Sequence, residues 1–166
     1  AYAVHQCDQF AANPKFEHGK AIKWLGRYLC GTKDKGIYLT LTNYNFEVFA
    51  NADFAGNWDP DDLIDANTSK SRSGYYIWFM GCTIMWKSQL QTITALSTTE
   101  AEYICLIQVL HKVIPLMCLV QEMKDLGYPI GSNQPQIMWS AFEDNSGTLA
   151  NAKAPAMRPR TKHLNN

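Results

Sequence analysis

Three acidic residues, each at the edge of an apolar segment, constrain this chain more than any other feature. Asp53 lies at the end of the apolar run 46–54, Glu102 lies within the segment STTEAEY, and Asp144 ends the run QIMWSAFED. Carboxylates at the ends of buried elements are costly to bury unless they bind a metal or take part in chemistry. If these elements are neighbours in one layer of sheet and helix, the carboxylates converge. They then form an all-oxygen site suited to Mg²⁺ or Mn²⁺ and to phosphodiester chemistry.

Composition narrows the class of protein. A chain of 166 residues that is 46% hydrophobic can form one ordinary domain with a real core. Its 15 basic and 15 acidic residues cancel, so overall charge does not indicate a nucleic-acid binder, although a local basic patch is compatible with it. The five cysteines lack CxxC spacing, which favours buried free thiols in a reducing compartment over a disulfide framework or a zinc site.

The chain contains no uninterrupted apolar stretch of the ~18 residues that a membrane span needs, and it does not open with a signal peptide. We therefore expect an intracellular protein that is not secreted and has no membrane partner. The sequence begins and ends abruptly, which suggests that the chain was excised from a longer polypeptide.

Apolar periodicity predicts the elements of the first third of the chain. Asn13 and Pro14 form a helix-start signal, and the amphipathic pattern that follows runs to Gly31. Residues 37–42 alternate between apolar and polar, as in a half-buried strand. The next alternation, over residues 46–54, places its small and apolar side chains on one face and Asp53 on the other, so Asp53 is displayed rather than packed in the core.

The rest of the chain reads as strands, a long helix, a strand and a short helix. The run 75–80 does not alternate, as expected of a strand covered on both faces; residues 83–86 would be its hairpin partner after Gly81, and 91–96 a short strand or a loop. Residues 98–126 are helical, with Pro115 dividing or kinking the helix. Residues 137–142 form a strand, and Ser146 would cap a helix through Ala152. This order predicts a mixed α/β sheet with helices packed on it, with Asp53 and Asp144 at the ends of neighbouring strands.

Helix geometry distinguishes Glu102 from Glu100. Two residues that are two positions apart in a helix point about 200° away from each other around its axis, so only one of these glutamates can face the site. With Gln108, His111 and Lys112 as the solvent side, Glu102 lies about 120° from Gln108 and Glu100 about 80°. Glu102 is the more inward residue, whereas Glu100 is expected to cap the helix start together with the hydroxyls of residues 97–99.

Several motifs in order resemble the ribonuclease H domain of copia-type long-terminal-repeat retrotransposons. These are NADFAG, SKSRSGYYIWFMGCTIMWKS, ALSTTEAEY, EDNSGTLANAK and RTKH. Residues 1–43 are similar to the connection segment, a helix plus a strand, that follows the reverse transcriptase in those polyproteins. The resemblance implies a ribonuclease H-like fold over residues 44–166. In the family a last strand and helix follow the RTKH stretch, so we expect the fold to lack them and to leave a sheet edge open.

The resemblance also implies a reaction. In the family the carboxylates that match Asp53, Glu102 and Asp144 hold two divalent ions, Mg²⁺ or Mn²⁺, and cleave the RNA strand of an RNA:DNA hybrid to leave a 5′-phosphate. Asp53 would bridge the two ions. The family's fourth carboxylate falls near Asn165, whose amide oxygen is a weaker, uncharged ligand. His163 could replace that ligand or carry a proton to the leaving oxygen, or it could belong to an ordinary exposed tail.

Hybrid contacts are expected from polar residues on the strands and helix starts: Lys70, Arg72, Ser88, Gln91, Ser97 and Asn145, with Lys87 beside them. Ordinary surface positions are the alternative interpretation for these side chains. Trp78, Trp86 and Trp139 could stack on bases, although their place in strand runs favours core packing.

Two other classes of function stay open. The chain could be a catalytically weakened or inactive module that binds hybrids or supports a reverse transcriptase, which Asn165 favours. It could also be an interaction domain in which residues 1–43 dock on the reverse transcriptase of the same polyprotein. The expected partners are therefore an RNA:DNA hybrid, that reverse transcriptase, and a second copy of the chain at the open sheet edge. The expected location is a cytoplasmic retrotransposon particle.

Overall fold

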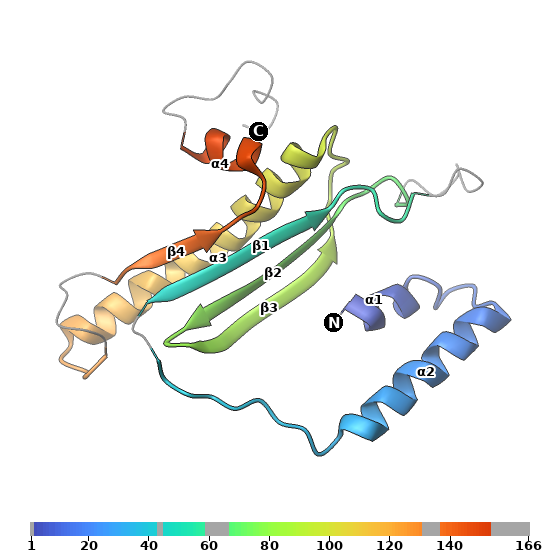
Figure 1. Cartoon of the computed structure of the whole chain (residues 1–166), viewed down its shortest axis with the longest axis horizontal. Coiled ribbons are helices and arrows are strands. Elements are labelled where there is room, and N and C mark those ends of the chain that lie inside the picture. The colour runs from blue at the N-terminus through green and yellow to red at the C-terminus, as the bar shows by residue number, and fades with distance from the viewer. Residues whose placement is uncertain (1, 43–44, 59–66, 131–136, 154–166) are drawn as a thin grey trace. The chain divides into compact units, whose positions relative to one another are not determined.

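A computed structural model describes residues 2–42, 45–58, 67–130 and 137–153. The chain divides into two compact units, residues 1–39 and 40–166. Figure 1 shows the helices and strands of both units. The first unit contains α1 (Tyr2–Asp8) and α2 (Phe16–Thr32), and α2 confirms the helix predicted after Pro14.

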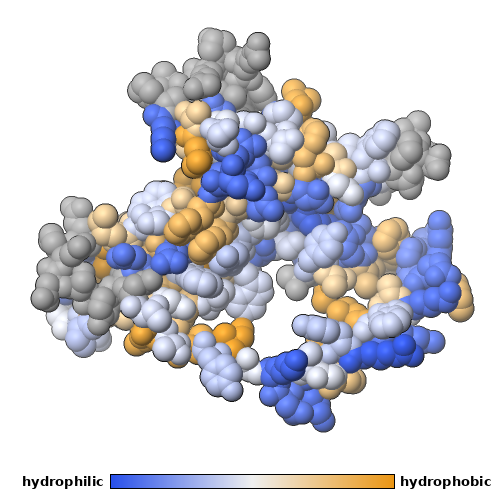
Figure 2. Space-filling view, in the orientation of Figure 1, coloured by the Kyte–Doolittle hydropathy of each residue, from blue (hydrophilic) through white to orange (hydrophobic). Residues whose placement is uncertain are grey.

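Neither helix of the first unit contains a buried residue. Trp24 is 69% exposed, and Phe16, Tyr28 and Leu29 are exposed as well. Figure 2 shows hydrophobic residues next to strongly hydrophilic ones on the surface of α2. The role of this unit as a connection segment remains a prediction.

The strand predicted over residues 37–42 is wrong. This segment does not pair with another strand in the described part of the chain, and Ile37, Leu39 and Leu41 are all exposed. Alternation produces a half-buried strand only where a partner supplies hydrogen bonds and a covered face. Here the chain makes an isolated ladder-like contact, in which the Thr42 N–H donates to the Met80 carbonyl at 3.0 Å.

The second unit is built on a mixed sheet. In the described residues the sheet contains β1 (Phe46–Asp53), β2 (Arg72–Phe79), β3 (Cys82–Leu90) and β4 (Trp139–Phe142), in the order β3-β2-β1-β4. β2 is antiparallel to both β1 and β3, whereas β4 is parallel to β1 (Figure 1). Together with its helices this is the predicted mixed α/β fold, and it is consistent with a ribonuclease H-like arrangement.

The tight connection between β2 and β3 depends on glycine. Met80 and Gly81 have φ values of +56° and +80°. A Cβ atom on Gly81 would overlap Oγ1 of Thr42 and approach the Thr40 carbonyl at 3.2 Å. Only glycine combines this backbone conformation with so little space, so the predicted strand end at Gly81 is confirmed.

The core lies between one face of the sheet and α3 (Thr98–Asp125). Val48 and Ile77 from the strands are fully buried there, as are Cys105, Val109 and Val113 from the helix. α3 continues through Pro115, so the predicted division into two helices is wrong. Buried residues on both sides of the proline, Val113 and Val120, hold the two halves of the helix in the same core.

α3 is also long and apolar enough to cross a membrane, judged by length and composition alone. The core helix of a globular domain passes the same test. Val109 and Val113 of α3 pack in the core against the sheet, whereas Ile114 and Leu119 of the same helix are exposed.

The other face of the sheet differs from expectation. β2 starts at Arg72 and is not covered on both faces, because Tyr76 is exposed. Phe49 stacks between Tyr76 and Phe142, with ring centroids 4.5 and 4.6 Å away, and forms an aromatic row across three strands. The prediction that the tryptophans pack in the core is wrong for Trp86, which is 58% exposed, and for Trp139, which is exposed on an edge strand. Strand alternation places both outside the core that α3 covers.

The remaining predictions are largely confirmed. Residues 91–96 form a loop, and β3 is longer than the predicted hairpin partner. The final described helix, α4 (Ser146–Ala152), has the predicted extent, but its cap is Asn145 rather than Ser146. The Asn145 side chain accepts the Thr148 N–H at 3.0 Å because an amide oxygen at this position reaches the third residue of the helix. The five cysteines are free, as predicted, but only Cys82 and Cys105 are buried, whereas Cys30 and Cys118 are exposed.

Candidate metal site

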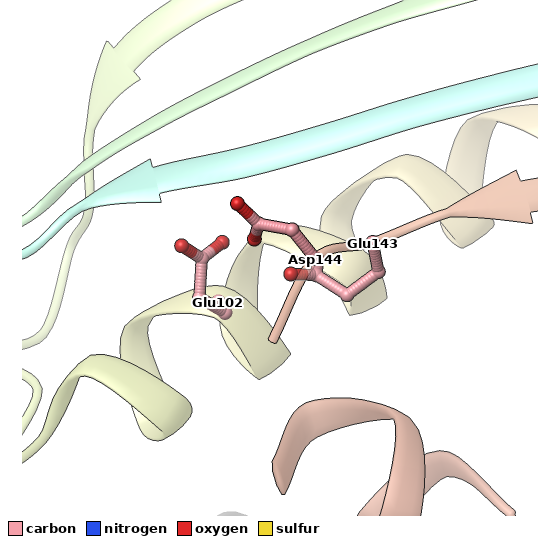
Figure 3. A group of neighbouring side chains, drawn as sticks. All are labelled: Glu102, Glu143 and Asp144. Carbon is pink, nitrogen blue, oxygen red and sulfur yellow. The ribbon is translucent and has the colours of Figure 1, made fainter. Parts of the chain in front are cut away.

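Three carboxylates from two separate parts of the chain converge in the second unit. One oxygen from each of Glu102, Glu143 and Asp144 lies within 4.8 Å of the other two. Figure 3 shows the Glu102 side chain, from α3, facing those of Glu143 and Asp144, which follow β4. Sequence reasoning predicted the meeting of Glu102 and Asp144 but not the third member. An oxygen-only group of this kind suits a hard divalent cation.

The start of α3 holds Glu102 in place. Ser97 caps the helix by accepting the Glu100 N–H at 3.2 Å, and Glu100 reaches back to accept the Leu96 N–H at 2.9 Å. This arrangement confirms the capping role predicted for Glu100. Glu102, which is 4% exposed, accepts the Ala52 N–H of β1 at 2.6 Å. Of the two glutamates, Glu102 is the one that lies in the acidic group, and its role as a metal ligand stays a prediction.

Burial and mutual repulsion make the negative charge of this group unfavourable. The pKa of Glu102 rises to about 7, first because burial removes its hydration and then because Glu143 and Asp144 are close, while the Ala52 N–H opposes the shift. Burial likewise raises the pKa of Glu143, against the effect of its Asn145 hydrogen bond. A bound cation would remove this repulsion, and the group is arranged to gain from one.

Sequence reasoning missed Glu143. A continuing strand would point adjacent residues to opposite faces, so Asp144 and Glu143 could not both face the site. β4 ends at Phe142, however, and the chain turns, which brings both side chains to the same side. Oε1 of Glu143 accepts the Asn145 N–H at 3.2 Å, while Oε2 is buried with no hydrogen-bond partner among the described residues. The end of β4 just before two consecutive acids was the signal that could have identified it.

Asp53 does not belong to this group. It is exposed at the end of β1, and its carboxylate lies against Gly56, where an added Cβ would overlap it. Register explains the separation. Phe49 is the last residue of β1 that pairs with β4, so β1 continues four residues beyond the ladder to Asp53, whereas Glu143 and Asp144 directly follow Phe142, the partner of Phe49. The predicted neighbouring strands are confirmed, but their ends are staggered.

The predicted substrate residues occupy varied positions. Lys70 donates to the Asn67 side chain at 2.9 Å, Arg72 is buried on β2 opposite Asp53, and Ser88 is half-buried on β3. Gln91 is 1% exposed and joins β2 to α3 by donating to Ser73 and to the Ala101 carbonyl.

Ser97 and Asn145, also predicted to contact substrate, cap α3 and α4 respectively. The two helix starts are tied together, since Thr148 donates to the Thr99 carbonyl at 3.1 Å. His163 and Asn165 lie outside the described residues.

A cleft of about 560 Å³ opens beside the acids. Glu143 and Asp144 line one side, Asn51 and Gly74 contribute polar and backbone surface, and the aromatic row, defined above by Phe49, Tyr76 and Phe142, lines the rest. The cleft therefore joins a carboxylate group to an apolar aromatic surface.

A mixed α/β fold with an acidic, oxygen-only site at the strand ends defines a candidate metal-binding α/β domain. Comparison with known proteins places it among transposon sequences. The chain is 33% identical over 164 residues to the retrovirus-related Pol polyprotein from transposon TNT 1-94 of Nicotiana tabacum, which covers 99% of this chain and 11% of that protein. It is 32% identical over 165 residues to the corresponding polyprotein from transposon RE2 of Arabidopsis thaliana, covering 99% of this chain and 10% of that protein.

A shorter relative is the secreted RxLR effector protein 161 of Plasmopara viticola, 32% identical over 125 residues, which covers 75% of this chain and 82% of that protein. No family model and no solved structure matches the chain. Over nearly its whole length the chain is similar to one segment of the retrovirus-related Pol polyproteins from these plant transposons. It spans about a tenth of the length of the polyproteins that it matches.

Proposed function

We propose that this chain is the ribonuclease H domain of a retrotransposon Pol polyprotein and hydrolyses the RNA strand of RNA:DNA hybrids. One observation carries the proposal: Glu102 and Asp144, which belong to two separate motifs of the resemblance, meet in one acidic group. Nothing in the local sequence of either segment requires them to be adjacent. Their convergence is what a shared metal site would need.

The donor set fits Mg²⁺ or Mn²⁺. All three side chains offer hard oxygen ligands, and the buried Oε2 of Glu143 lacks a hydrogen-bond partner in the described part of the chain. Two bound ions would activate the attacking water and stabilise the leaving 3′ oxygen, leaving a 5′-phosphate on the product. The Ala52 N–H donates to Oε2 of Glu102, which helps to hold this carboxylate beside Glu143 and Asp144.

Asp53 would join this set by a side-chain rotation. Its carboxylate is exposed and rests on Gly56, so leaving that position breaks no buried contact. Rotation about χ1 between staggered positions costs little for an exposed side chain. His163 and Asn165 keep the roles proposed from the resemblance, as proton carrier and fourth ligand.

Hybrid recognition would depend on shape. An A-like hybrid offers phosphates and 2′-hydroxyls rather than readable base edges, so we expect little sequence preference. The cleft beside Glu143 and Asp144 is the natural place for the scissile strand, with the aromatic row in contact with its sugars.

The test is cleavage of an end-labelled RNA:DNA hybrid with Mg²⁺ or Mn²⁺, with single-stranded RNA and RNA duplex as substrate controls. Glu102→Gln should abolish hybrid-specific cutting, whereas Glu122→Gln, an exposed acid near the other end of α3, should leave it unchanged. Equal cutting by the wild type and Glu102→Gln would refute the proposal.

A second function is favoured by the position of Asp53. Because Asp53 stands apart from the acidic group, the chain could bind metal and hybrid with weak or absent turnover, as a structural module of a reverse transcriptase. Calorimetric titration with Mn²⁺ distinguishes the two functions. Metal binding that Glu102→Gln removes, without any cutting of the hybrid, would favour the module.

The exposed apolar side chains of α2 support docking of residues 1–43 on the reverse transcriptase of the same polyprotein. β3 and β4 are the edges of the sheet in the described residues, and a second copy could pair at an edge of this kind.

A further inference from the structure

A second cleft lies between α3 and the edge of the sheet, away from the acidic group. It measures about 320 Å³, and the side chains that line it include Lys87, Gln89, Gln108, His111 and Lys112. Its position is set by simple geometry. Lys87 and Gln89 are two apart on β3 and share a face, while Gln108, His111 and Lys112 follow the spacing of one helix face.

The walls of this cleft are held in place. Tyr75, the cross-strand partner of Lys87, is 5% exposed and forms part of the lining. Gln89 donates an amide N–H to Gln108 at 3.5 Å, which links β3 to α3. Lys87, His111 and Lys112 remain exposed at the mouth. The cleft thus presents cationic donors above a buried floor.

The described residues that line the cleft include no aspartate or glutamate. The sequence from residue 67 to 99, which includes β2 and β3, contains Lys70, Arg72 and Lys87 but no aspartate or glutamate. Residues 103–121 of α3 contain His111 and Lys112 and are likewise free of acids. The chain as a whole is neutral, so this is a local excess of positive charge.

We propose that this cleft binds a backbone phosphate of the nucleic acid that the acidic site cuts. The inference deepens the proposed function and rests on it. His111 lies ~14 Å along the helix axis from Glu102 and about half a turn around it, so the two sites are separate. A polyanion is repelled by a carboxylate group, and a cationic anchor at a second point would hold the strand in position.

The test is fluorescence anisotropy with a labelled RNA:DNA hybrid in EDTA, where cleavage cannot occur. The wild type is compared with Lys87→Gln/Lys112→Gln and with the control Lys23→Gln/Lys35→Gln, which removes two exposed lysines of the first unit. The cleft variant should bind about tenfold more weakly, and the slope of log Kobs against log salt should fall by roughly 2. The control should retain the wild-type slope, and thermal melting should show that all three proteins are folded.

Identical slopes for the wild type and the cleft variant would overturn the inference, as would equal losses in both double variants or no wild-type binding at all. The outcome is separable from that of the proposed function. If the chain fails to cut hybrids with Mg²⁺ or Mn²⁺ but the cleft variant still shows the smaller slope, the phosphate site stands and the nuclease does not.

Discussion

The backbone N–H of Ala52 in β1 donates a 2.6 Å hydrogen bond to Oε2 of Glu102 in α3. β4 pairs with β1 only as far as Phe49, so Glu102 takes the place of a strand partner beyond that point. The same side chain therefore completes the edge of a strand and contributes to the acidic group.

This double role predicts different results for two substitutions of Glu102. Glu102→Gln keeps an oxygen that can accept the Ala52 N–H, so it should remove Mn²⁺ binding without lowering the free energy of unfolding. Glu102→Ala removes the acceptor as well and should cost about 1–3 kcal/mol because the buried N–H loses its partner. Urea unfolding in EDTA measures both, and equal stabilities for the two variants would contradict the argument.

The raised pKa of Glu102 predicts how stability changes with pH when divalent cations are absent. The pKa of Glu102 is about 7 in the folded protein against an ordinary value of 4.5, so the folded state binds the proton more tightly. The stabilisation from this group is complete below pH 4.5 and is lost as the pH rises toward 7 and through it. Thermal melting in EDTA between these values should show a shallower decline for Glu102→Gln than for the wild type. Parallel curves would argue against the shift.

Gly56 allows a test of the proposal that the Asp53 side chain rotates to join the acidic group. Gly56→Ala fills the space where the Asp53 carboxylate now rests and should drive it away at little cost, because that carboxylate is exposed. Hybrid cleavage should then survive in Gly56→Ala and be lost in Asp53→Asn. If Gly56→Ala is as inactive as Asp53→Asn, the present position of Asp53 is the one that the reaction needs.

Two glycines with positive φ should respond differently to alanine. Gly127 has open space around it, so Gly127→Ala should cost only the backbone strain, about 1–2 kcal/mol. Gly81→Ala adds the overlap with Thr42 and should cost more. Denaturant midpoints of the two variants provide the comparison, and the prediction fails if Gly127→Ala is the less stable.

Replacing Pro115 should stabilise the fold. The helix continues through it although proline lacks the N–H that would bond to the preceding turn, and residue 115 is exposed. Pro115→Ala restores that bond and should raise the free energy of unfolding by about 1–3 kcal/mol. Urea unfolding would show an unchanged or lower value if the helix had already adapted fully to the proline.

Sequence reasoning succeeded where a single periodicity decided the outcome. Alternation over residues 46–53 matched β1 because α3 covers one face of that strand, whereas the same pattern over 37–42 failed for want of a partner strand. The acid pair Glu102 and Asp144 was predictable from the family motifs. Glu143 and the stagger of Asp53 were not, since one depends on where β4 ends and the other on the β1–β4 register. Neither the end of β4 nor this register can be predicted from the local sequence.

The acidic group also has a place in the order of folding. Glu102 precedes β4 in the chain, and Glu143 and Asp144 reach it only when the four residues of β4 pair with β1. A chain emerging from the ribosome can form the β1–β3 meander and α3 first, because these contacts are closer in sequence. Until β4 docks it carries a lone glutamate and no metal site. In the function we propose, metal affinity would therefore report on completion of the fold, and the enzyme would be inactive until its last described strand is in place.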